Sequence, residues 1–270
     1  LHLSLRRQRQ MCIRDSVNPK NIKMMRGSEL NFAITGYTAW APGIETPEAW
    51  AAWARVPFVI EGNSEAGVRQ MPPMLRRRAG TLGKMALEVA YQALEERSGI
   101  PVIFCSRHGE VGRSLGLLRD LVQNQPLSPM SFGLAVHNAI AGLFSIARAD
   151  HANHPALAAG ASTLEHAVIE ACGLLADGAE QVLLVAYDQP LPEVFAQFED
   201  SHEQPYAWAW LLEETGANMM RLSWRAANEQ AVEEYKVMPA GLDILRFQLS
   251  GEQFLERVAD HRCWRWERHA

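Results

Sequence analysis

The chain has 270 residues, of which 48% are hydrophobic and 21% charged, a composition that allows a buried globular core. Its formal net charge of −5 excludes the basic field with which a nucleic-acid-binding domain holds a phosphate backbone. No apolar stretch reaches the roughly 20 residues of a membrane-spanning helix. The four cysteines form neither a C-x-x-C pair nor a zinc spacing. We therefore expect one cytoplasmic domain with free thiols, which binds no metal, cofactor or nucleic acid and does not span a membrane.

The first two dozen residues differ from the rest of the chain. Four arginines fall within residues 6–14, without the apolar region or the cleavage site of a secretory signal. A transit peptide is one interpretation, but the stretch RQRQMCIRDS also resembles adapter-derived sequence in translated assemblies. We therefore expect residues 1–24 to be a non-native or disordered extension, with the start near Met24 or Met25, and residues 25–270 to form the domain.

From Leu30 onward, hydrophobic periodicity and turn residues predict alternating strands and helices. The expected strands are 30–40, 101–105, 155–159, 181–187, 206–212 and 219–224, and helices are expected after Thr46, over 82–94 and 110–123, from Ser162 and over 242–258. The segment Ser162-Thr163-Leu164-Glu165 has the form of a capping box, which predicts the start of a helix. Because strands alternate with helices, we expect an α/β fold with layered helices around a mixed, mostly parallel sheet.

The best-formed candidate site is the strand-to-helix turn from Ala158 to Ser162. Such turns direct backbone N–H groups and one side chain at a ligand, which makes Ser162 a candidate nucleophile. The sequence lacks the closing glycine of a G-x-S-x-G motif, however, and serine is a preferred residue at a helix N-cap. We favour the capping role for Ser162, with catalysis as the alternative.

A second group of candidates lies around Cys105. This cysteine is followed by His108 and Glu110, which invites a Cys-His-acid interpretation. Adjacency in sequence rarely gives the geometry of a triad, and a cysteine that ends an apolar strand is more often a buried core thiol. His137 and Asn138 either line a pocket or form a hydrogen-bonded core pair, and the sequence leaves both interpretations open.

Three consecutive arginines, Arg76, Arg77 and Arg78, stand at the start of a helix. A basic cluster of this kind can contact an acidic partner such as an acyl carrier protein. The simpler interpretation is a solvated turn whose charges pair with glutamates on neighbouring surfaces. We favour the solvated turn and keep the carrier contact as the alternative.

The stretch from Ser128 to Asp188 resembles the middle of the N-terminal domain of β-ketoacyl synthases, a family with a thiolase-like fold. In that family a segment N-x-x-A-G-x-x-S-I precedes a strand and the nucleophile turn A-C-A-S, and a helix and a buried strand follow. The first segment is matched by Asn138, Ala141, Gly142, Ser145 and Ile146, and the turn by Ala159, Ala161 and Ser162. A weaker resemblance extends over most of residues 30–224.

The sequence departs from this family at the residue that carries the chemistry. Where the synthases have the acyl-accepting cysteine, this chain has Gly160, and a hydrogen cannot form a thioester. The family's second half supplies two histidines for decarboxylation, whereas His261 and His269 lie in a charged, Trp-rich tail without that context. The resemblance therefore implies the N-terminal half of the fold only, with no catalytic residue and no independent condensing activity.

Polyketide systems pair an active synthase with a catalytically silent subunit, the chain-length factor. The segments SRHGE (106–110), SPMSF, AVHN and YAWAWLL resemble short chain-length-factor-like proteins of aryl polyene pathways. The resemblance implies a heterodimer with a full-length β-ketoacyl synthase, with acyl carrier protein as an indirect partner. The residues expected at the acyl tunnel or the dimer interface are Leu115, Leu118, Met130, Phe132, His137, Asn138, Gly160 and Ser162.

Two other functions remain open. The chain could be an acyl hydrolase or acyltransferase that uses Ser162 or Cys105 together with His108 or His137. It could also be a homodimeric scaffold that holds acyl carriers together without contacting a synthase. Because an unpaired half of a thiolase-like fold exposes a large apolar surface, we also expect the chain to be poorly soluble alone.

Overall fold

The computed structural model describes residues 29–227 and 236–268, so the predicted extension and His269 lie outside the described residues. Its strands are β1 (Glu29–Trp40), β2 (Val102–Cys105), β3 (Ala156–Leu157), β4 (Val182–Asp188), β5 (Tyr206–Glu213), β6 (Met219–Ala226), β7 (Phe254–Ala259) and β8 (Arg262–Arg268). Its α-helices are α2 (Pro47–Arg55), α3 (Pro73–Arg76), α4 (Thr81–Leu94), α5 (Val111–Val122), α6 (Pro129–Gly133), α7 (Ala139–Arg148), α8 (Thr163–Ala176) and α9 (Ala240–Ser250). The 3₁₀ helices η2 (Gly160–Ser162) and η3 (Glu193–Phe198) complete the elements used below.

The strands form one mixed sheet in the order β3-β2-β4-β5-β1-β6-β8-β7. Strand β2 is parallel to both of its neighbours, β3 and β4, and the other adjacent pairs are antiparallel. The expectation of a mostly parallel sheet was therefore wrong, although the α/β class and the mixed sheet are confirmed. The reason lies in which strands pair, because β5 and β6 lie on either side of β1 and both run antiparallel to it. The short turn between β7 and β8 adds a hairpin, which reverses the chain without a crossover helix.

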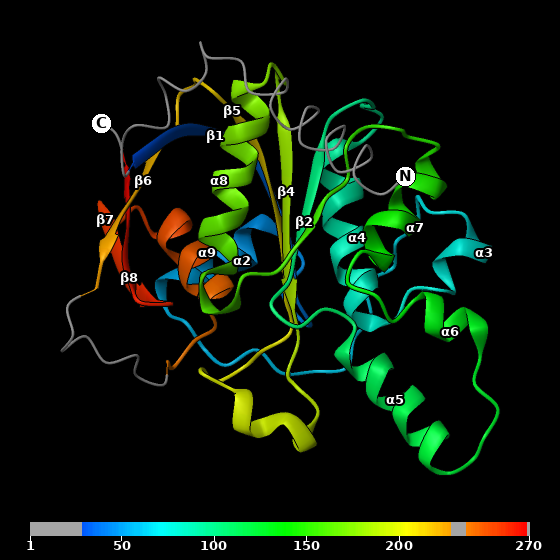
Figure 1. Cartoon of the computed structure of the whole chain (residues 1–270). Coiled ribbons are helices and arrows are strands. Elements are labelled where there is room, and N and C mark those ends of the chain that lie inside the picture. Colours follow the sequence, from blue (N-terminus) through cyan, green and yellow to red (C-terminus); the bar gives the residue numbers. More distant parts are fainter. Residues whose placement is uncertain (1–28, 228–235, 269–270) are drawn as a thin grey trace, which may run out of the picture.

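Helices cover both faces of the sheet (Figure 1). One face packs against α2, α8 and α9, and its core includes the completely buried Trp208, Trp210, Trp264 and Trp266. The other face packs against α4 and α7, around Phe104 and Phe144. Among the described helices, none has the length and apolar character that crossing a bilayer requires.

Local signals located several helices correctly. Thr46 is the N-cap of α2, and its side chain accepts a hydrogen bond from the Ala49 N–H at 3.3 Å. The predicted helix over 242–258, in contrast, was wrong in its second half. Helix α9 ends at Ser250 because Gly251 takes a left-handed conformation, with φ of +79°, and residues 254–259 form a strand paired with β8.

Helices α5 and α6 extend away from the body of the molecule (Figure 1). Between them a loop that spans residues 123–128 reverses the chain. The apolar side chains of this hairpin are mostly exposed to solvent rather than packed on the sheet. We call the following set the α5–α6 surface: Leu118, Leu121, Val122, Leu127, Met130 and Phe132.

Candidate functional site

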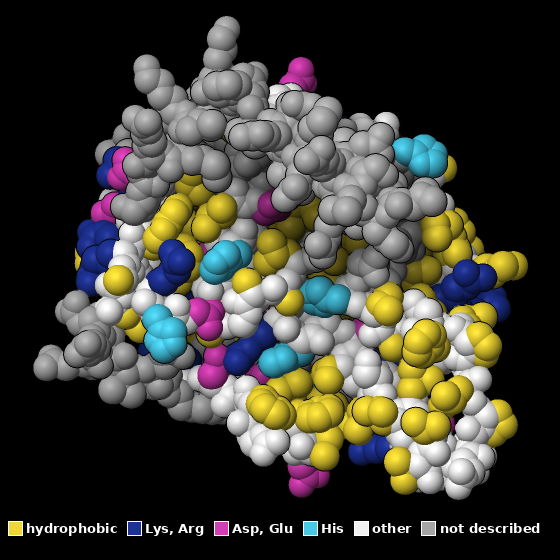
Figure 2. Space-filling model, viewed as in Figure 1, with side chains coloured by type: hydrophobic (Ala, Val, Ile, Leu, Met, Phe, Trp, Pro, Cys, Tyr) yellow, Lys and Arg dark blue, Asp and Glu magenta, His cyan; other side chains and the backbone are white. Residues whose placement is uncertain are grey.

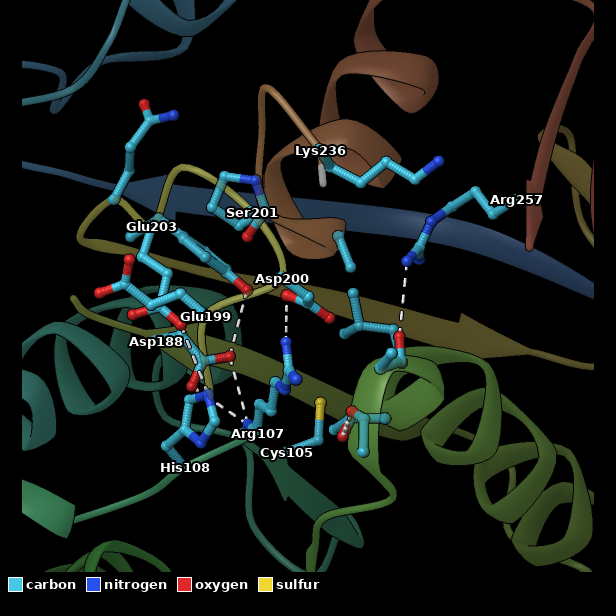
Figure 3. A pocket seen from close by; sticks show the side chains of 18 of the residues that line it. Cys105, Arg107, His108, Asp188, Glu199, Asp200, Ser201, Glu203, Lys236 and Arg257 are labelled. Carbon is cyan, nitrogen blue, oxygen red and sulfur yellow. Dashed lines mark hydrogen bonds and ion pairs between the residues drawn. The ribbon is translucent and has the colours of Figure 1, made fainter. Parts of the chain in front are cut away.

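The three parallel strands place their carboxyl ends at one edge of the sheet. Cys105 ends β2, Asp188 ends β4, and the turn with Gly160 follows β3. Ligands of open α/β sheets bind in the crevice outside these ends. A cavity of about 270 Å³ lies at this edge and is lined by all three residues. Figure 3 shows Cys105 and Asp188 in this cavity.

The turn after β3 has the shape expected of a nucleophile turn, with a glycine at its centre. Gly160 has φ of +58°, a left-handed conformation that favours glycine, and η2 leads directly into α8. The Thr163 hydroxyl stabilises the turn by accepting from the Ala159 N–H at 2.9 Å and donating to the Gly160 carbonyl at 2.8 Å. The predicted strand-to-helix turn is therefore formed, and its central residue has no side chain.

Ser162 precedes α8 as predicted, but its side chain does not cap the helix. The hydroxyl donates to Asp260 Oδ2 at 2.5 Å, and the backbone N–H of Ser162 donates to the same oxygen at 2.8 Å. Glu165, the other member of the predicted capping box, instead accepts from Arg257 at 2.9 Å. The capping box was wrong because two residues of the distant β7–β8 hairpin bind its side chains.

The segment 106–110 connects the ends of β2 and β4. The Ser106 hydroxyl donates to Asp188 at 2.7 Å and accepts from the Gly109 N–H at 2.8 Å. Asp188 also accepts from the Arg107 N–H at 3.1 Å and from the Tyr206 hydroxyl at 3.3 Å. Burial raises the pKa of the Asp188 carboxyl, and the hydrogen bonds from Ser106 and Arg107 oppose this rise.

The charges around the cavity are mixed. Arg107 forms an ion pair with Asp200, and His108 Nε2 lies 3.5 Å from Glu203 Oε1. The basic and acidic side chains of the lining are Arg107, His108, Lys236, Arg257, Asp188, Glu199, Asp200 and Glu203 (Figure 3). Because the two signs are nearly balanced, the cavity does not select a ligand of one charge. Among the described residues, no group of histidine, cysteine, aspartate and glutamate side chains is arranged to hold a metal ion.

An apolar groove of about 380 Å³ adjoins this cavity. It shares Arg107, His108 and Gly160 with the cavity, and its other walls are Val111, Leu191, Phe195 and Phe198. The side chains of Val194 and Phe198 on η3 are 58% and 56% exposed. Sequence reasoning missed η3, because its apolar residues fall in a short stretch with neither helical nor strand periodicity.

The candidate nucleophiles do not have catalytic surroundings. Cys105 is buried, as the core-thiol interpretation predicted, and burial raises the pKa of its thiol well above the ordinary value. Ser162 has no exposed surface, and its hydroxyl is bound to Asp260. His137 packs against Gly109, where an added Cβ would lie 2.5 Å from His137 Nδ1. The buried thiol of Cys105 and the Asp260-bound hydroxyl of Ser162 therefore do not have the surroundings of an activated nucleophile.

The remaining predicted residues lie on the surface or near it. Leu115 is half-buried, and the exposed fractions of Leu118, Met130 and Phe132 are 53%, 58% and 67%. Figure 2 shows hydrophobic side chains gathered over this part of the molecule. Asn138 is exposed at the start of α7, so it does not form a core pair with His137.

The three arginines lie at the end of the short helix α3. Arg76 donates to the carbonyl oxygens of Gly67 and Val68, at 3.3 and 3.4 Å. Arg77 is exposed, and the carbonyl of Arg78 accepts from Arg113 at 3.2 Å. The bonds of Arg76 are made to backbone carbonyls, which orient its side chain along the adjacent loop.

A mixed sheet between two helical layers, with a strand-to-helix turn at the ends of its parallel strands, is the architecture of thiolase-like α/β domains. The family model described as the β-ketoacyl synthase N-terminal domain matches residues 50–267, and the chain belongs to this family. A search of curated protein sequences found no match.

Solved structures agree with this assignment. The chain is 27% identical, with a TM-score of 0.77, to a chain in the structure of the ketosynthase ApeO in complex with its chain length factor ApeC from Xenorhabdus doucetiae. That match covers 88% of this chain and 100% of the other. The ishigamide ketosynthase/chain length factor shares the fold at 16% identity and a TM-score of 0.59, over 74% of this chain and 68% of the other.

Proposed function

We propose that this protein is a catalytically silent ketosynthase-like subunit, a chain-length factor, that pairs with an active β-ketoacyl synthase and shapes its acyl tunnel. The observation that carries the proposal is Gly160. It occupies the nucleophile position of a turn that is otherwise retained, so the chain has the architecture of a synthase domain without the group that accepts an acyl chain. The similarity to a chain from a complex of a ketosynthase with its chain length factor supports this role.

The α5–α6 surface supports pairing with another protein. Its six apolar side chains are between 44% and 82% exposed on a hairpin that extends from the body. Contiguous apolar patches on soluble proteins mark sites of protein–protein contact. We assign this surface to the full-length synthase, with acyl carrier protein reaching the complex through the synthase.

The same hairpin supplies the side chains proposed to set product length. Leu115 is half-buried beside the exposed Leu118 on α5, and Met130 and Phe132 lie on α6. In a heterodimer these side chains would meet the acyl tunnel at the interface. Adding atoms to a packed space costs about 1–3 kcal/mol, which is enough to change the distribution of chain lengths without new chemistry.

The hydrolase alternative has less support. It requires an accessible Ser162 or an ionisable Cys105, whereas the first side chain is completely buried and the burial of the second favours its neutral thiol. A homodimeric scaffold would use the same α5–α6 surface, and the co-expression experiment below distinguishes it from a chain-length factor.

The test is co-expression of residues 25–270 with the synthase encoded beside this protein, followed by size exclusion and mass determination. We expect a one-to-one heterodimer whose condensing activity disappears when the synthase cysteine is replaced. Leu118→Asp and Phe132→Asp should weaken the complex at least tenfold, whereas Val56→Asp, at an exposed apolar residue after α2, should not. The proposal would be overturned if the protein stayed a homodimer or monomer and did not bind the synthase. Covalent labelling of Ser162 or Cys105 by an active-site reagent would overturn it too.

A further inference from the structure

The tip of the β7–β8 hairpin lies against the turn that contains Gly160. This tip consists of Asp260 and His261, with φ of +49° and +60°. Two left-handed residues are the geometry of a tight hairpin turn that matches the twist of its strands, and aspartate tolerates it better than most residues. The hairpin thereby holds the Asp260 carboxylate against residues nearly one hundred positions earlier in the chain.

The Asp260 carboxylate occupies space that a side chain at position 160 would need. A Cβ added to Gly160 would lie 3.1 Å from Oδ1 and 3.3 Å from Oδ2 of Asp260. Both distances are shorter than ordinary van der Waals contact, so one of the groups would have to move. Asp260 is held in place, because Oδ2 accepts two hydrogen bonds from Ser162.

The strand that leads to Asp260 is also fixed. Arg257 on β7 pairs with the completely buried Glu165 and also donates to the Ala161 carbonyl at 3.4 Å. Trp264 and Trp266 on β8 have no exposed surface. The hairpin is therefore bound to the turn and to α8 at several points, and Asp260 cannot move away without breaking buried contacts.

We propose that Asp260 shields this turn, so that a cysteine placed at position 160 is a poor acyl acceptor. The inference rests on the proposed function as a catalytically silent subunit and extends it, because it attributes the lack of acyl-accepting activity to two residues instead of one. Gly160 has no nucleophilic side chain, and Asp260 makes the turn unfavourable for a nucleophilic side chain at this position.

The chemical reason is the charge of Asp260. A cysteine accepts an acyl group by losing its thiol proton and attacking the carbonyl carbon of a thioester, which releases the carrier thiol. A carboxylate beside the sulfur disfavours the thiolate, since both groups are negative. The Ser162 N–H at the start of α8 donates to Asp260 at 2.8 Å and to the Ala159 carbonyl at 3.3 Å, so it is not available to stabilise another anion at this helix end.

The test compares Gly160→Cys with Gly160→Cys/Asp260→Asn in the full chain. Asparagine keeps the shape and an acceptor for Ser162 but removes the charge. The rate of alkylation at position 160 by iodoacetamide is followed from pH 6 to 9, with the modified peptide identified by mass spectrometry. We expect the double variant to react roughly tenfold faster at neutral pH, with a correspondingly lower thiol pKa. Equal rates and equal thiol pKa values would overturn the proposal.

Gly43 provides the matched control. It also has a positive φ, of +78°, and no heavy atom lies within 4 Å of an added Cβ. The alkylation rate of Gly43→Cys should be unchanged by Asp260→Asn, which separates the local charge from any general change in the protein.

A second variant serves if Gly160→Cys does not fold. Ser162→Cys replaces only the atom that already contacts Asp260, and its thiolate can be titrated by ultraviolet absorbance. Its thiol pKa should fall when Asp260 becomes asparagine, and an unchanged value would count against the shield. Neither measurement involves a synthase, so failure of the heterodimer and failure of the shield are distinguishable.

Discussion

Arg257 and Glu165 form an ion pair in the interior of the protein, with 2.9 Å between Nη1 and Oε1. The Glu165 side chain has no exposed surface, and the Trp266 indole N–H lies 3.4 Å from the same oxygen. The pair joins the C-terminal hairpin to α8 directly behind the turn that contains Gly160. Because the ion pair links two segments far apart in sequence, it makes the shape of this turn depend on the hairpin.

Removing one partner of this pair should destabilise the protein strongly. Arg257→Met leaves the Glu165 carboxylate buried and unpaired, which costs about 3–5 kcal/mol. The double variant Arg257→Met/Glu165→Gln should lose less of the free energy of unfolding, because no unpaired charge remains in the interior. Urea unfolding followed by circular dichroism measures both effects.

The control for this comparison is Arg265→Met on the neighbouring strand. Arg265 pairs with Glu256 at 2.9 Å, but both side chains are about two-fifths exposed. Exposed pairs contribute about 0–1 kcal/mol, so this variant should stay close to the wild type. Equal losses in the free energy of unfolding for Arg257→Met and Arg265→Met would contradict the prediction that the buried pair is the more important for stability.

The stability of the protein should depend on pH through Asp188, whose pKa is raised by burial. Well below the ordinary aspartate pKa of about 3.9, the carboxyl is protonated in the folded and the unfolded chain and costs no stability. As the pH rises, the unfolded chain releases its proton first, so Asp188 lowers the free energy of unfolding until the folded carboxyl has ionised too. Asp188→Asn should remove this loss.

The measurement is the free energy of unfolding in urea from about pH 4 to about pH 7, a range chosen from the ordinary aspartate pKa. The difference between Asp188→Asn and the wild type should shift in favour of the variant as the pH rises. Asp177→Asn, at an exposed aspartate that follows α8, is the control and should run parallel to the wild type. If the free energy of unfolding of Asp188→Asn also ran parallel to that of the wild type over this pH range, the prediction would be refuted.

Gly109 should be intolerant of a side chain, because its φ is +55° and an added Cβ would overlap the His137 ring. We expect Gly109→Ala to cost more than about 1 kcal/mol, and Gly109→Ala/His137→Ala to recover part of that loss. Thermal unfolding measures both. Gly116→Ala is the control, since Gly116 lies in the middle of α5 with open space around an added Cβ, and the change should stabilise the helix by about 0.5–1 kcal/mol.

The proposed tunnel role predicts a change in the products of the assembled heterodimer. In the reconstituted heterodimer, Phe132→Ala should shift the products toward longer polyenes, because a large side chain at the interface has been removed. Chromatography with mass spectrometry measures the chain lengths. Val56→Ala, outside the α5–α6 surface, should leave the distribution unchanged, and an unaltered distribution for Phe132→Ala would remove this residue from the tunnel.

Much of the fold follows from local patterns in the sequence. The N-cap at Thr46, the apolar stripe of α4 and the buried strands β2 and β4 were all predicted from periodicity within a few turns of chain. The strand-to-helix turn at Gly160 was predicted in the same way. Such features depend on neighbours close in sequence, and for that reason the sequence by itself determined them.

The tertiary structure decided the features that depend on distant partners. The antiparallel majority of the sheet follows from which strands pair, and local periodicity does not encode this choice. Ser162 was correctly placed before α8, but its hydroxyl binds Asp260, which is 98 positions later in the chain. A buried hydrogen-bonding group takes the partner that folding places beside it, and long-range packing rather than helix-capping preference therefore determined how this turn is closed.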